Sequence, residues 1–519
     1  MSRPVPETVA FELNGRPETV PDDGGSLLDA LRKRLGVRSV KDGCSPQGQC
    51  GCCTVLVDGA PRVACVTPAA RVAGRAVTTV EGLADADRWA EAFTATGASQ
   101  CGFCTPGIIV RLAATRQPVD QALLAHLCRC TGWQTIEEAA ALVSVSRSSE
   151  NLTGRQTSVK REGAEKRAAI EGRTPQRAGP KIALGGGGFA DDTAPADALV
   201  AVRAANGSWV VGETLAEARA ASGRVPGRRS TVGLRWPLEV PPGPWARTLR
   251  TTGVEPAYLE RAASWCHPGG EPASPLANGG AFGGKLTSEA AAVARRLADE
   301  HGRAVRVLLS REDAVRLGPK RPPVAAGVRA DGTGVVRVVR TPGIAAAIAS
   351  AGGGLDVEEV EVSGPPTSAA LRGAGCAEAS VLRAALGAGP DRVTTPAGAV
   401  AEATVTDAGV SVRVRAGTPL DTVVLRSYCI GAAHMALGWV RSEGIAVDAA
   451  GEPQDLTIRS FGILRSVDMP PVEVEIEPDD GPPVNGSDAV FAAVAAAAWR
   501  HEGFPPDWPV RRSGYGRSP

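Results

Sequence analysis

The stretch Asp42-Gly-Cys-Ser-Pro-Gln-Gly-Gln-Cys-Gly-Cys-Cys-Thr54 decides the fold of the first part of this chain. It places Cys44, Cys50 and Cys53 on one glycine-rich loop, and Cys65 follows on the next expected strand. Three thiolates on a loop and a fourth from a hairpin form the ligand layout of a plant-type [2Fe-2S] cluster. The glycines let the backbone curl tightly and point N–H groups at the cluster sulfurs. The sequence therefore predicts a [2Fe-2S] site here.

The spacing of this first group departs from the plant-type rule by one residue. Cys44 and Cys50 are separated by five residues rather than four, which a flexible loop can absorb. Cys52 could compete with Cys53, but Cys50 and Cys53 keep the two-residue gap, so we interpret Cys52 as a spare thiol. The alternative, a set of buried free cysteines, has no packing rationale around three glycines.

A second cysteine group lies in the stretches Gln100-Cys-Gly-Phe-Cys-Thr-Pro-Gly107 and Cys128-Arg-Cys-Thr-Gly132. Cys101 and Cys104 come just before an expected helix, where unpaired N–H groups favour a thiolate. Cys128 and Cys130 supply a matching pair at the next helix junction. Four thiolates from two turns beside helices predict a second [2Fe-2S] cluster.

Other chemistry for these cysteines is weaker. A zinc site also accepts four cysteines, but the one-residue gap between Cys128 and Cys130 is unusual for zinc, and only five histidines are available in the chain. A redox-active Cys-x-x-Cys of thioredoxin type needs a βαβ context that is missing here. Disulfides are unnecessary in a chain long enough to bury a core.

The pattern of hydrophobic residues divides the chain into four parts, which together indicate an α+β multidomain protein. Alternation and turns such as Asn14-Gly15, with a helix that begins at Ser26, predict a β-grasp ferredoxin-like domain over residues 1–83. Helical periodicity predicts a helical bundle over 84–143, with helices at 85–96, 106–115, 119–126 and 135–143. Residues 144–181 contain almost no large apolar side chains and are expected to be a linker without order. Residues 182–519 indicate an irregular α/β domain with short strands and few strong helices.

Composition restricts the function classes. The 57 Lys and Arg residues nearly balance the 56 Asp and Glu residues, so no basic field is available for nucleic acid. No stretch approaches the ~18 consecutive apolar residues of a membrane span, and Met1 to Ala10 does not read as a signal peptide. We therefore expect a cytoplasmic protein that binds neither nucleic acid nor membrane.

The cysteine motifs resemble the iron–sulfur subunit of the xanthine oxidase and aldehyde oxidase (molybdenum hydroxylase) family. The resemblance spans about residues 8–133 and rests on two independent cysteine constellations in the family's order. It implies electron transfer through the helical cluster and then the β-grasp cluster. In this family the glutamine at the position of Gln100 contacts the molybdopterin, so Gln100 is an expected cofactor contact.

Fragments of the C-terminal part resemble the molybdopterin-binding subunit of the same family. Asn278-Gly-Gly-Ala-Phe-Gly-Gly-Lys285 is similar to its glycine-rich cofactor loop, and Leu371-Arg-Gly-Ala-Gly375 is similar to a later segment. The resemblance implies a molybdenum–molybdopterin cofactor contacted by Gly279, Gly280, Phe282, Gly283 and Arg372. The loop also nearly spells a phosphate-binding Walker A motif, but Leu286 stands where that motif needs Ser or Thr. A plain turn-rich loop is a further alternative.

Two departures from the family concern catalysis. The fragments occupy about half the usual length, and Gly481 in Asp480-Gly-Pro-Pro483 stands where the family places its glutamate general base. Loss of such a base typically costs ~100- to 10,000-fold in rate. Glu473, Glu475 and Glu477 alternate along an expected edge strand, where a solvated face explains them.

Two hypotheses follow. The first is an oxidoreductase of molybdenum hydroxylase type that acts on a small molecule and passes electrons through both clusters to a separate acceptor. The second is an iron–sulfur electron carrier or assembly partner, without catalysis, whose C-terminal domain is degenerate. Since no flavin domain is recognisable, the acceptor is expected to be a separate FAD-binding subunit or another protein. A homo-oligomer is an expectation from the family.

Overall fold

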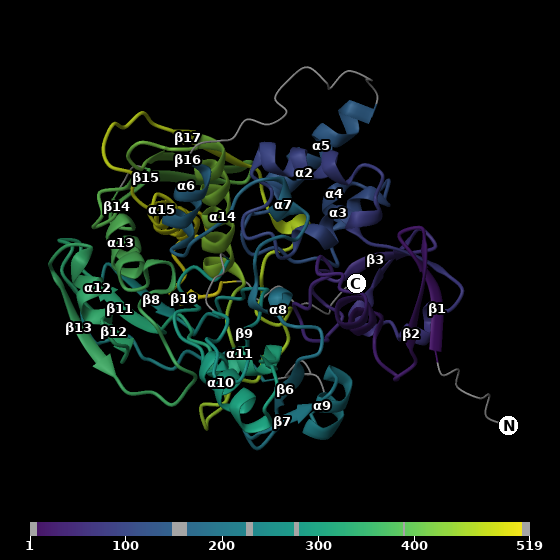
Figure 1. Cartoon of the computed structure of the whole chain (residues 1–519). Helices are drawn as coiled ribbons and strands as arrows, with labels where there is room; N and C mark the ends of the chain where they lie inside the picture. Colours follow the sequence, from purple (N-terminus) through teal and green to yellow (C-terminus); the bar gives the residue numbers. More distant parts are fainter. Residues whose placement is uncertain (1–7, 148–162, 225–231, 275–279, 388–389, 511–519) are drawn as a thin grey trace.

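The computed structural model describes residues 8–147, 163–224, 232–274, 280–387 and 390–510. It is a multidomain α+β fold, as the sequence predicts (Figure 1). The N-terminal sheet lies on one side of the molecule, and the three sheets of the C-terminal part lie on the other. The helices that follow the first sheet lie above it in this view, beside α14 of the C-terminal part.

The first domain is built on a five-stranded sheet with the order β2-β1-β5-β3-β4. Its strands are β1 Thr8–Leu13, β2 Arg16–Pro21, β3 Thr54–Val57, β4 Ala60–Val63 and β5 Ala76–Thr78. The predicted hairpin turn is present, with left-handed φ angles of 52° at Asn14 and 80° at Gly15. Ser26 begins the expected helix by accepting from the backbone N–H of Asp29, but only α1 (Leu27–Asp29) is α-helical. The helix continues as a π-helix over Ala30–Arg34.

The predicted helical bundle consists of α2 Ala86–Thr96, α3 Thr105–Ala113, α4 Val119–Ala122 and α5 Gln134–Arg147. Helix α4 is shorter than expected, because the backbone after Ala122 bonds elsewhere. The carbonyl oxygen of Leu124 accepts from the Arg459 guanidinium at 3.0 Å, and the N–H of Leu127 donates to the oxygen of Cys50 at 3.0 Å. This irregular segment leads directly into Cys128.

The expected linker 144–181 is largely ordered in its described second half, and the prediction is wrong there. Helices α6 (Ala164–Gly172) and α7 (Pro180–Ala183) form in and beside it. Arg167 is fully buried and donates to the carbonyl oxygens of Pro419 and Val484, each at 2.8 Å. Its neighbour Glu171 accepts from the backbone N–H of Ser487 at 2.8 Å. Buried hydrogen bonds of charged side chains therefore order α6, where composition suggested solvation. Residues 148–162 of this prediction lie outside the described residues.

The C-terminal part contains three sheets. The first has the strand order β7-β6-β10-β9. Its strands are β6 Leu199–Arg203, β7 Trp209–Gly212, β9 Ala263–Cys266 and β10 Val305–Leu308. The helices nearby in sequence are α8 Ala190–Thr193, α9 Leu215–Ser222, α10 Ala290–His301 and α11 Arg311–Leu317. The second has the order β13-β12-β11-β8-β18 and comprises β8 Arg247–Thr251, β11 Val324–Val328, β12 Gly334–Val339, β13 Leu355–Val360 and β18 Asp507–Trp508, with α12 Ile344–Ser350. The third has the order β14-β15-β16-β17 and comprises β14 Asp391–Thr394, β15 Val400–Thr406, β16 Gly409–Arg415 and β17 Val472–Ile476.

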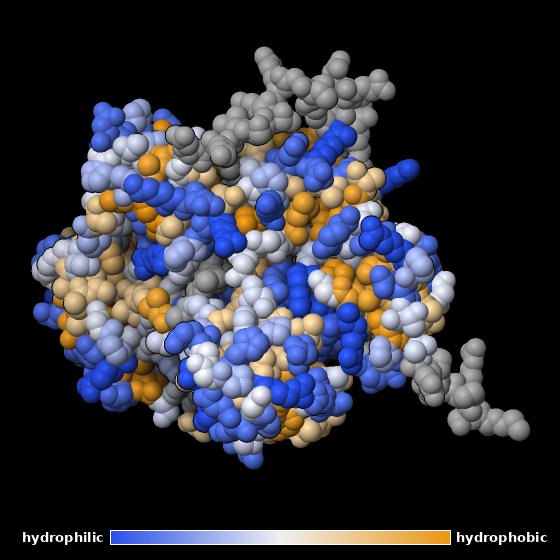
Figure 2. All heavy atoms as spheres, in the orientation of Figure 1, coloured by the Kyte–Doolittle hydropathy of each residue, from blue (hydrophilic) through white to orange (hydrophobic). Residues whose placement is uncertain are grey.

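Long helices are few among the described residues of this part, as the sequence indicated, and two of them form its core. They are α14 (Thr422–Arg441) and α15 (Ser487–His501), and both are apolar on nearly all sides because they are buried; α13 (Cys376–Ala384) packs against α15. Helix α14 is long and apolar enough to cross a membrane, but 89% of its most apolar window is buried inside the protein. It is therefore accounted for as a core helix (Figure 1). Hydrophilic residues are spread over the face shown in Figure 2.

Candidate functional site

The structure brings the first cysteine foursome together: Cys44, Cys50 and Cys53 lie on the loop between the π-helix and β3, and Cys65 lies in a short 3-10 helix after β4. Cys44, Cys50, Cys53 and Cys65 are each no more than 5% exposed. The Cys44 sulfur contacts the thiols of Cys50 and Cys65, and the backbone N–H of Cys65 lies 3.4 Å from the Cys53 sulfur. The backbone N–H of Gln47 points at the Cys44 sulfur at 3.3 Å. This is the pattern of N–H groups around sulfur that stabilises an anionic cluster.

The close approach of the sulfurs in this foursome shifts the pKa values of the thiols. Hydrogen bonds from the thiols of Cys50 and Cys65 hold the pKa of Cys44 well below its ordinary value. The same contacts raise the pKa of Cys50 and of Cys65, because each must give up its proton beside another sulfur. Thiols that share protons in this way can exchange those protons for metal ions, since the thiolate is the ligand form.

Cys52, expected to be a spare thiol, is also buried and contacts the Cys50 sulfur. Cys53 differs in that its sulfur receives the N–H of Cys65. The geometry is therefore compatible with Cys53 as ligand and Cys52 as a neighbour.

The second foursome gathers between α2 and α5. The sulfurs of Cys101 and Cys130 lie 3.6 Å apart, and the Cys104 thiol donates to the Cys128 sulfur. That contact lowers the pKa of Cys128 to about 6 and raises the pKa of Cys104. The Thr131 hydroxyl also lies 3.1 Å from the Cys128 sulfur.

The sulfurs of the second foursome form two pairs. Among the residues that the structure describes, no group of three or more His, Cys, Asp or Glu side chains is arranged to hold a single metal ion. A [2Fe-2S] cluster has two irons, each with two cysteine ligands in an all-cysteine site, and so needs paired rather than converging sulfurs. The paired arrangement suits this cluster better than the zinc alternative.

The two foursomes are packed against each other. A Cβ atom on Gly43 would lie 3.3 Å from the Cys52 sulfur and 3.2 Å from the ring of Phe103, which stands between two ligands of the second foursome. A Cβ atom on Gly107 in α3 would lie 2.4 Å from the carbonyl oxygen of Gly51. Glycine is therefore required at Gly107, and α3 approaches the first loop directly.

The C-terminal part covers the first loop. Arg311 donates to the carbonyl oxygen of Gly43 at 2.8 Å, and Arg459 donates to that of Gln49 at 2.8 Å. A buried ion pair joins Arg261 to Asp42, with 2.6 Å between nitrogen and oxygen. These long-range contacts fix the loop that carries three of the four sulfurs.

The C-terminal part also reaches the second foursome. Arg129 lies between Cys128 and Cys130 in sequence and makes a bidentate ion pair with Glu443, at 2.5 and 2.6 Å. Both side chains are no more than 3% exposed. This ion pair was not predicted from the sequence. Its only indication there was the charged Arg129 between the two expected ligands Cys128 and Cys130.

The residues expected to contact molybdopterin are partly brought together. Gly280 lies against the second foursome, since a Cβ atom there would be 2.9 Å from the Cys130 sulfur. The guanidinium of Arg372 stacks on the ring of Phe282, 4.0 Å from the ring centre. The backbone N–H of Arg372 donates to the carbonyl oxygen of Phe282 at 3.0 Å. A Cβ atom on Gly283 would lie 2.1 Å from the carbonyl oxygen of Ala370. Gly279 lies outside the described residues.

Gln100 is buried beside the second foursome. Its side-chain NH₂ group donates to the carbonyl oxygen of Cys130 and to the hydroxyl of Ser427, each at 2.9 Å. Its side-chain oxygen has no hydrogen-bond partner among the described residues.

The cavity that Phe282 and Arg372 share is smaller than a molybdopterin. Phe282, Arg372, Arg129 and Glu443 line a cavity of only about 30 Å³, with Met435 closing one side. That volume suits a few water molecules, whereas organic cofactor sites are typically about 300–1,000 Å³. Phe282 and Arg372 pack on each other beside this cavity, and Arg372 also borders a second cavity of about 290 Å³.

Two carboxylates, Glu255 and Glu443, line this cavity, but neither stands at the position where the resemblance predicts a general base. Gly481 is absent from its lining, and its carbonyl oxygen instead accepts from the N–H of Thr418 at 2.9 Å. Glu473 and Glu475 lie on β17, an edge strand, and Glu475 and Glu477 approach Arg413, as a solvated face requires.

Comparison with known protein families identifies both cysteine groups. Residues 11–74 match the 2Fe-2S iron-sulfur cluster binding domain, and residues 79–141 match the [2Fe-2S] binding domain.

Curated relatives match the same region over most of their own length. The small subunit of nicotine 6-hydroxylase from Paenarthrobacter nicotinovorans is 41% identical, over 27% of this chain and 92% of that protein. The iron-sulfur-binding subunit of xanthine dehydrogenase from Escherichia coli O157:H7 is 39% identical, over 25% of this chain and 91% of that protein.

A solved structure matches nearly the whole chain. The aldehyde oxidoreductase of Desulfovibrio gigas aligns with a TM-score of 0.70 and 15% identity, over 95% of this chain and 97% of that one. At this identity the likeness concerns the fold alone.

Proposed function

This chain belongs to the molybdenum hydroxylase (xanthine dehydrogenase and aldehyde oxidoreductase) family, and we propose that it is a two-cluster electron carrier whose C-terminal part keeps the fold without holding molybdopterin. The observation that carries this proposal is the 30 Å³ cavity beside the second foursome. A carrier needs the two clusters close together and insulated from water. It does not need a substrate cavity beside them.

The packing of the two cysteine groups supports transfer between clusters. Gly43 and Phe103 lie in contact between the foursomes, and Gly107 packs on the first loop. Seven of the eight expected ligands are buried, so water is kept away from both sites. Val66, next to Cys65, is 52% exposed, and we propose that electrons leave the first cluster through this surface.

The acceptor and the setting are also proposals. A separate FAD-binding subunit or another redox protein would take the electrons, because none of the described sheets carries a recognised flavin site. The near balance of 57 basic and 56 acidic residues favours protein partners over nucleic acid. A cytoplasmic location and self-association are consistent with the family but rest on that likeness alone.

Metal analysis of the purified chain tests the proposal. We expect about four iron atoms and about four acid-labile sulfides per chain, two of each for each [2Fe-2S] cluster, and no molybdenum. Molybdenum near one atom per chain would overturn it and support the hydroxylase hypothesis, which the placement of Gly280 against the second foursome favours. Iron near two would instead show that one foursome holds no cluster.

A further inference from the structure

A cavity of about 380 Å³ lies at one end of the second C-terminal sheet, away from the cysteines. Its floor is formed where β8 has ended at Gly253, β11 is about to begin at Pro323 and β12 ends at Val339. Loops around Ser363 and Val447 complete the lining. Sites on loops held by a rigid sheet are typical of ligand binding, and the volume is that of a small-molecule site.

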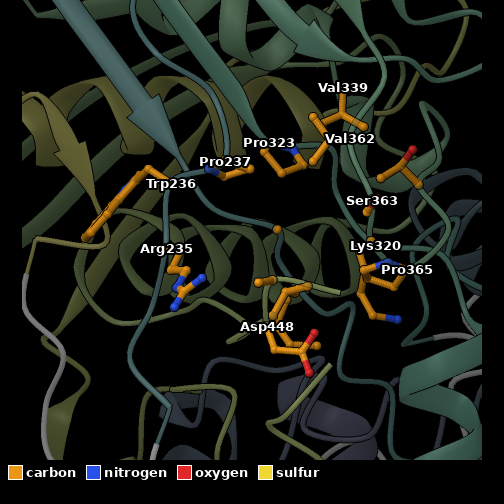
Figure 3. A pocket seen from close by; sticks show the side chains of 16 residues that line it. Arg235, Trp236, Pro237, Lys320, Pro323, Val339, Val362, Ser363, Pro365 and Asp448 are labelled. Carbon is orange, nitrogen blue, oxygen red and sulfur yellow. The ribbon is translucent and has the colours of Figure 1, made fainter. Parts of the chain in front are cut away.

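The two sides of this cavity differ in chemistry (Figure 3). Pro237, Pro323 and Val339 form an apolar side, and Arg235, Lys320 and Asp448 lie on the opposite side. This arrangement offers an apolar surface to the body of a ligand and charged groups to its polar end.

The cavity is held open by main-chain hydrogen bonds. The N–H of Lys320 donates to the oxygen of Pro366 at 2.7 Å, and the N–H of Ile445 donates to that of Gly253 at 3.0 Å. The indole of Trp236 is fixed by a bond of 2.7 Å to the oxygen of Trp508. A cavity formed in advance avoids the entropic cost of ordering its walls on binding.

Two of the three charged side chains already have partners. Lys320 is buried and forms an ion pair with Glu255 at 2.8 Å. Asp448 accepts from the N–H groups of Ala450 and Glu452 and from the side chain of Gln454, at 2.8 to 3.0 Å. Arg235 is exposed and makes no hydrogen bond or ion pair within the described part of the chain, so its guanidinium is the cationic group that is open to a ligand.

We propose that this cavity binds a small organic anion with a flat apolar body, whose carboxylate or similar group pairs with Arg235. A guanidinium binds a carboxylate through two parallel hydrogen bonds, which gives orientation as well as affinity. The site does not depend on either cluster or on the proposed carrier function.

Calorimetric titration of the full chain with benzoate, and with benzylamine as the oppositely charged probe of the same shape, tests this. We expect benzoate to bind with a dissociation constant of roughly 1 mM or tighter, and at least ~10-fold more tightly than benzylamine. Arg235→Ala should weaken benzoate about tenfold, since a charge-assisted bond is lost. Arg235→Glu should reverse the preference.

Arg71→Ala is the matched control, because Arg71 is an exposed arginine of the first domain that does not line the cavity. It should bind benzoate as the unaltered chain does. Val447→Trp, which adds bulk to the lining, should abolish binding of both probes. Absence of saturable benzoate binding, equal binding of the two probes, or unchanged binding by Arg235→Ala overturns the proposal. Loss of iron leaves it untouched.

Discussion

Replacing Gly280 by alanine tests whether the C-terminal part contributes to the second cluster. Gly280 has a φ angle of 86°, and a Cβ atom there would lie 2.9 Å from the Cys130 sulfur and 3.5 Å from the Cys101 sulfur. The left-handed conformation costs an alanine roughly 1–2 kcal/mol. The contact at 2.9 Å adds a steric term against a sulfur that the Cys101 sulfur already contacts from another side.

Gly332→Ala separates these two effects. Gly332 has a φ angle of 85°, nearly the same as that of Gly280, but no atom lies within 4 Å of its Cβ position. The free energy of unfolding of Gly332→Ala, measured in urea, should fall only by the conformational cost of roughly 1–2 kcal/mol. This variant should keep about four iron atoms per chain. Gly280→Ala should lose more stability than this control.

The expected readout for Gly280→Ala is selective. Iron should fall from about four to about two atoms per chain, and electron paramagnetic resonance of the reduced protein should retain one of two [2Fe-2S] signals. If Gly280→Ala and Gly332→Ala have the same iron content and the same spectra, the C-terminal loop does not touch the second cluster and the reasoning is refuted.

Three other predictions concern neighbouring features. Cys52→Ala should keep about four iron atoms while Cys53→Ala loses the first cluster, and iron analysis that gives the opposite result would exchange their roles. Glu443→Ala leaves Arg129 buried and unpaired, so urea unfolding should show a loss of about 3–5 kcal/mol; a loss below 1 kcal/mol would mean that the ion pair is not formed. Burial lowers the pKa of His434 to about 4, below the ordinary value of 6.5, so the unfolded chain binds one more proton between these values and stability falls as pH drops from about 6.5 to 4. His434→Gln should remove up to one proton from that dependence, measured by unfolding at several pH values, and an unchanged slope would contradict the pKa of His434.

The first 140 residues were predictable because their signals are local. The turn at Asn14-Gly15, the N-cap at Ser26 and the cysteine spacings each depend on neighbours in sequence, and each is found where expected. The length of α4 was not predictable, since the Arg459 contact with Leu124 that accompanies its end comes from more than 300 positions later.

The C-terminal part was harder for the same physical reason. Arg167 and Glu171 look like solvated residues of a linker, and only contacts with Pro419 and Ser487 make them buried. Helix α15 lacks an amphipathic pattern because every side is covered. The expected cofactor loop shows the limit of motif reasoning. Phe282 and Arg372 were both expected to contact a molybdopterin, and in the structure they contact each other.

The covering of the first loop by Arg311 and Arg459 bears on biogenesis. In the finished fold seven of the eight sulfur ligands are inaccessible, so a scaffold protein that delivers preassembled clusters cannot reach them. Docking of Arg311 and Arg459 onto the first loop would therefore hinder delivery to that site once the C-terminal part has folded. We therefore expect insertion of the clusters to precede docking of the C-terminal part onto the first loop.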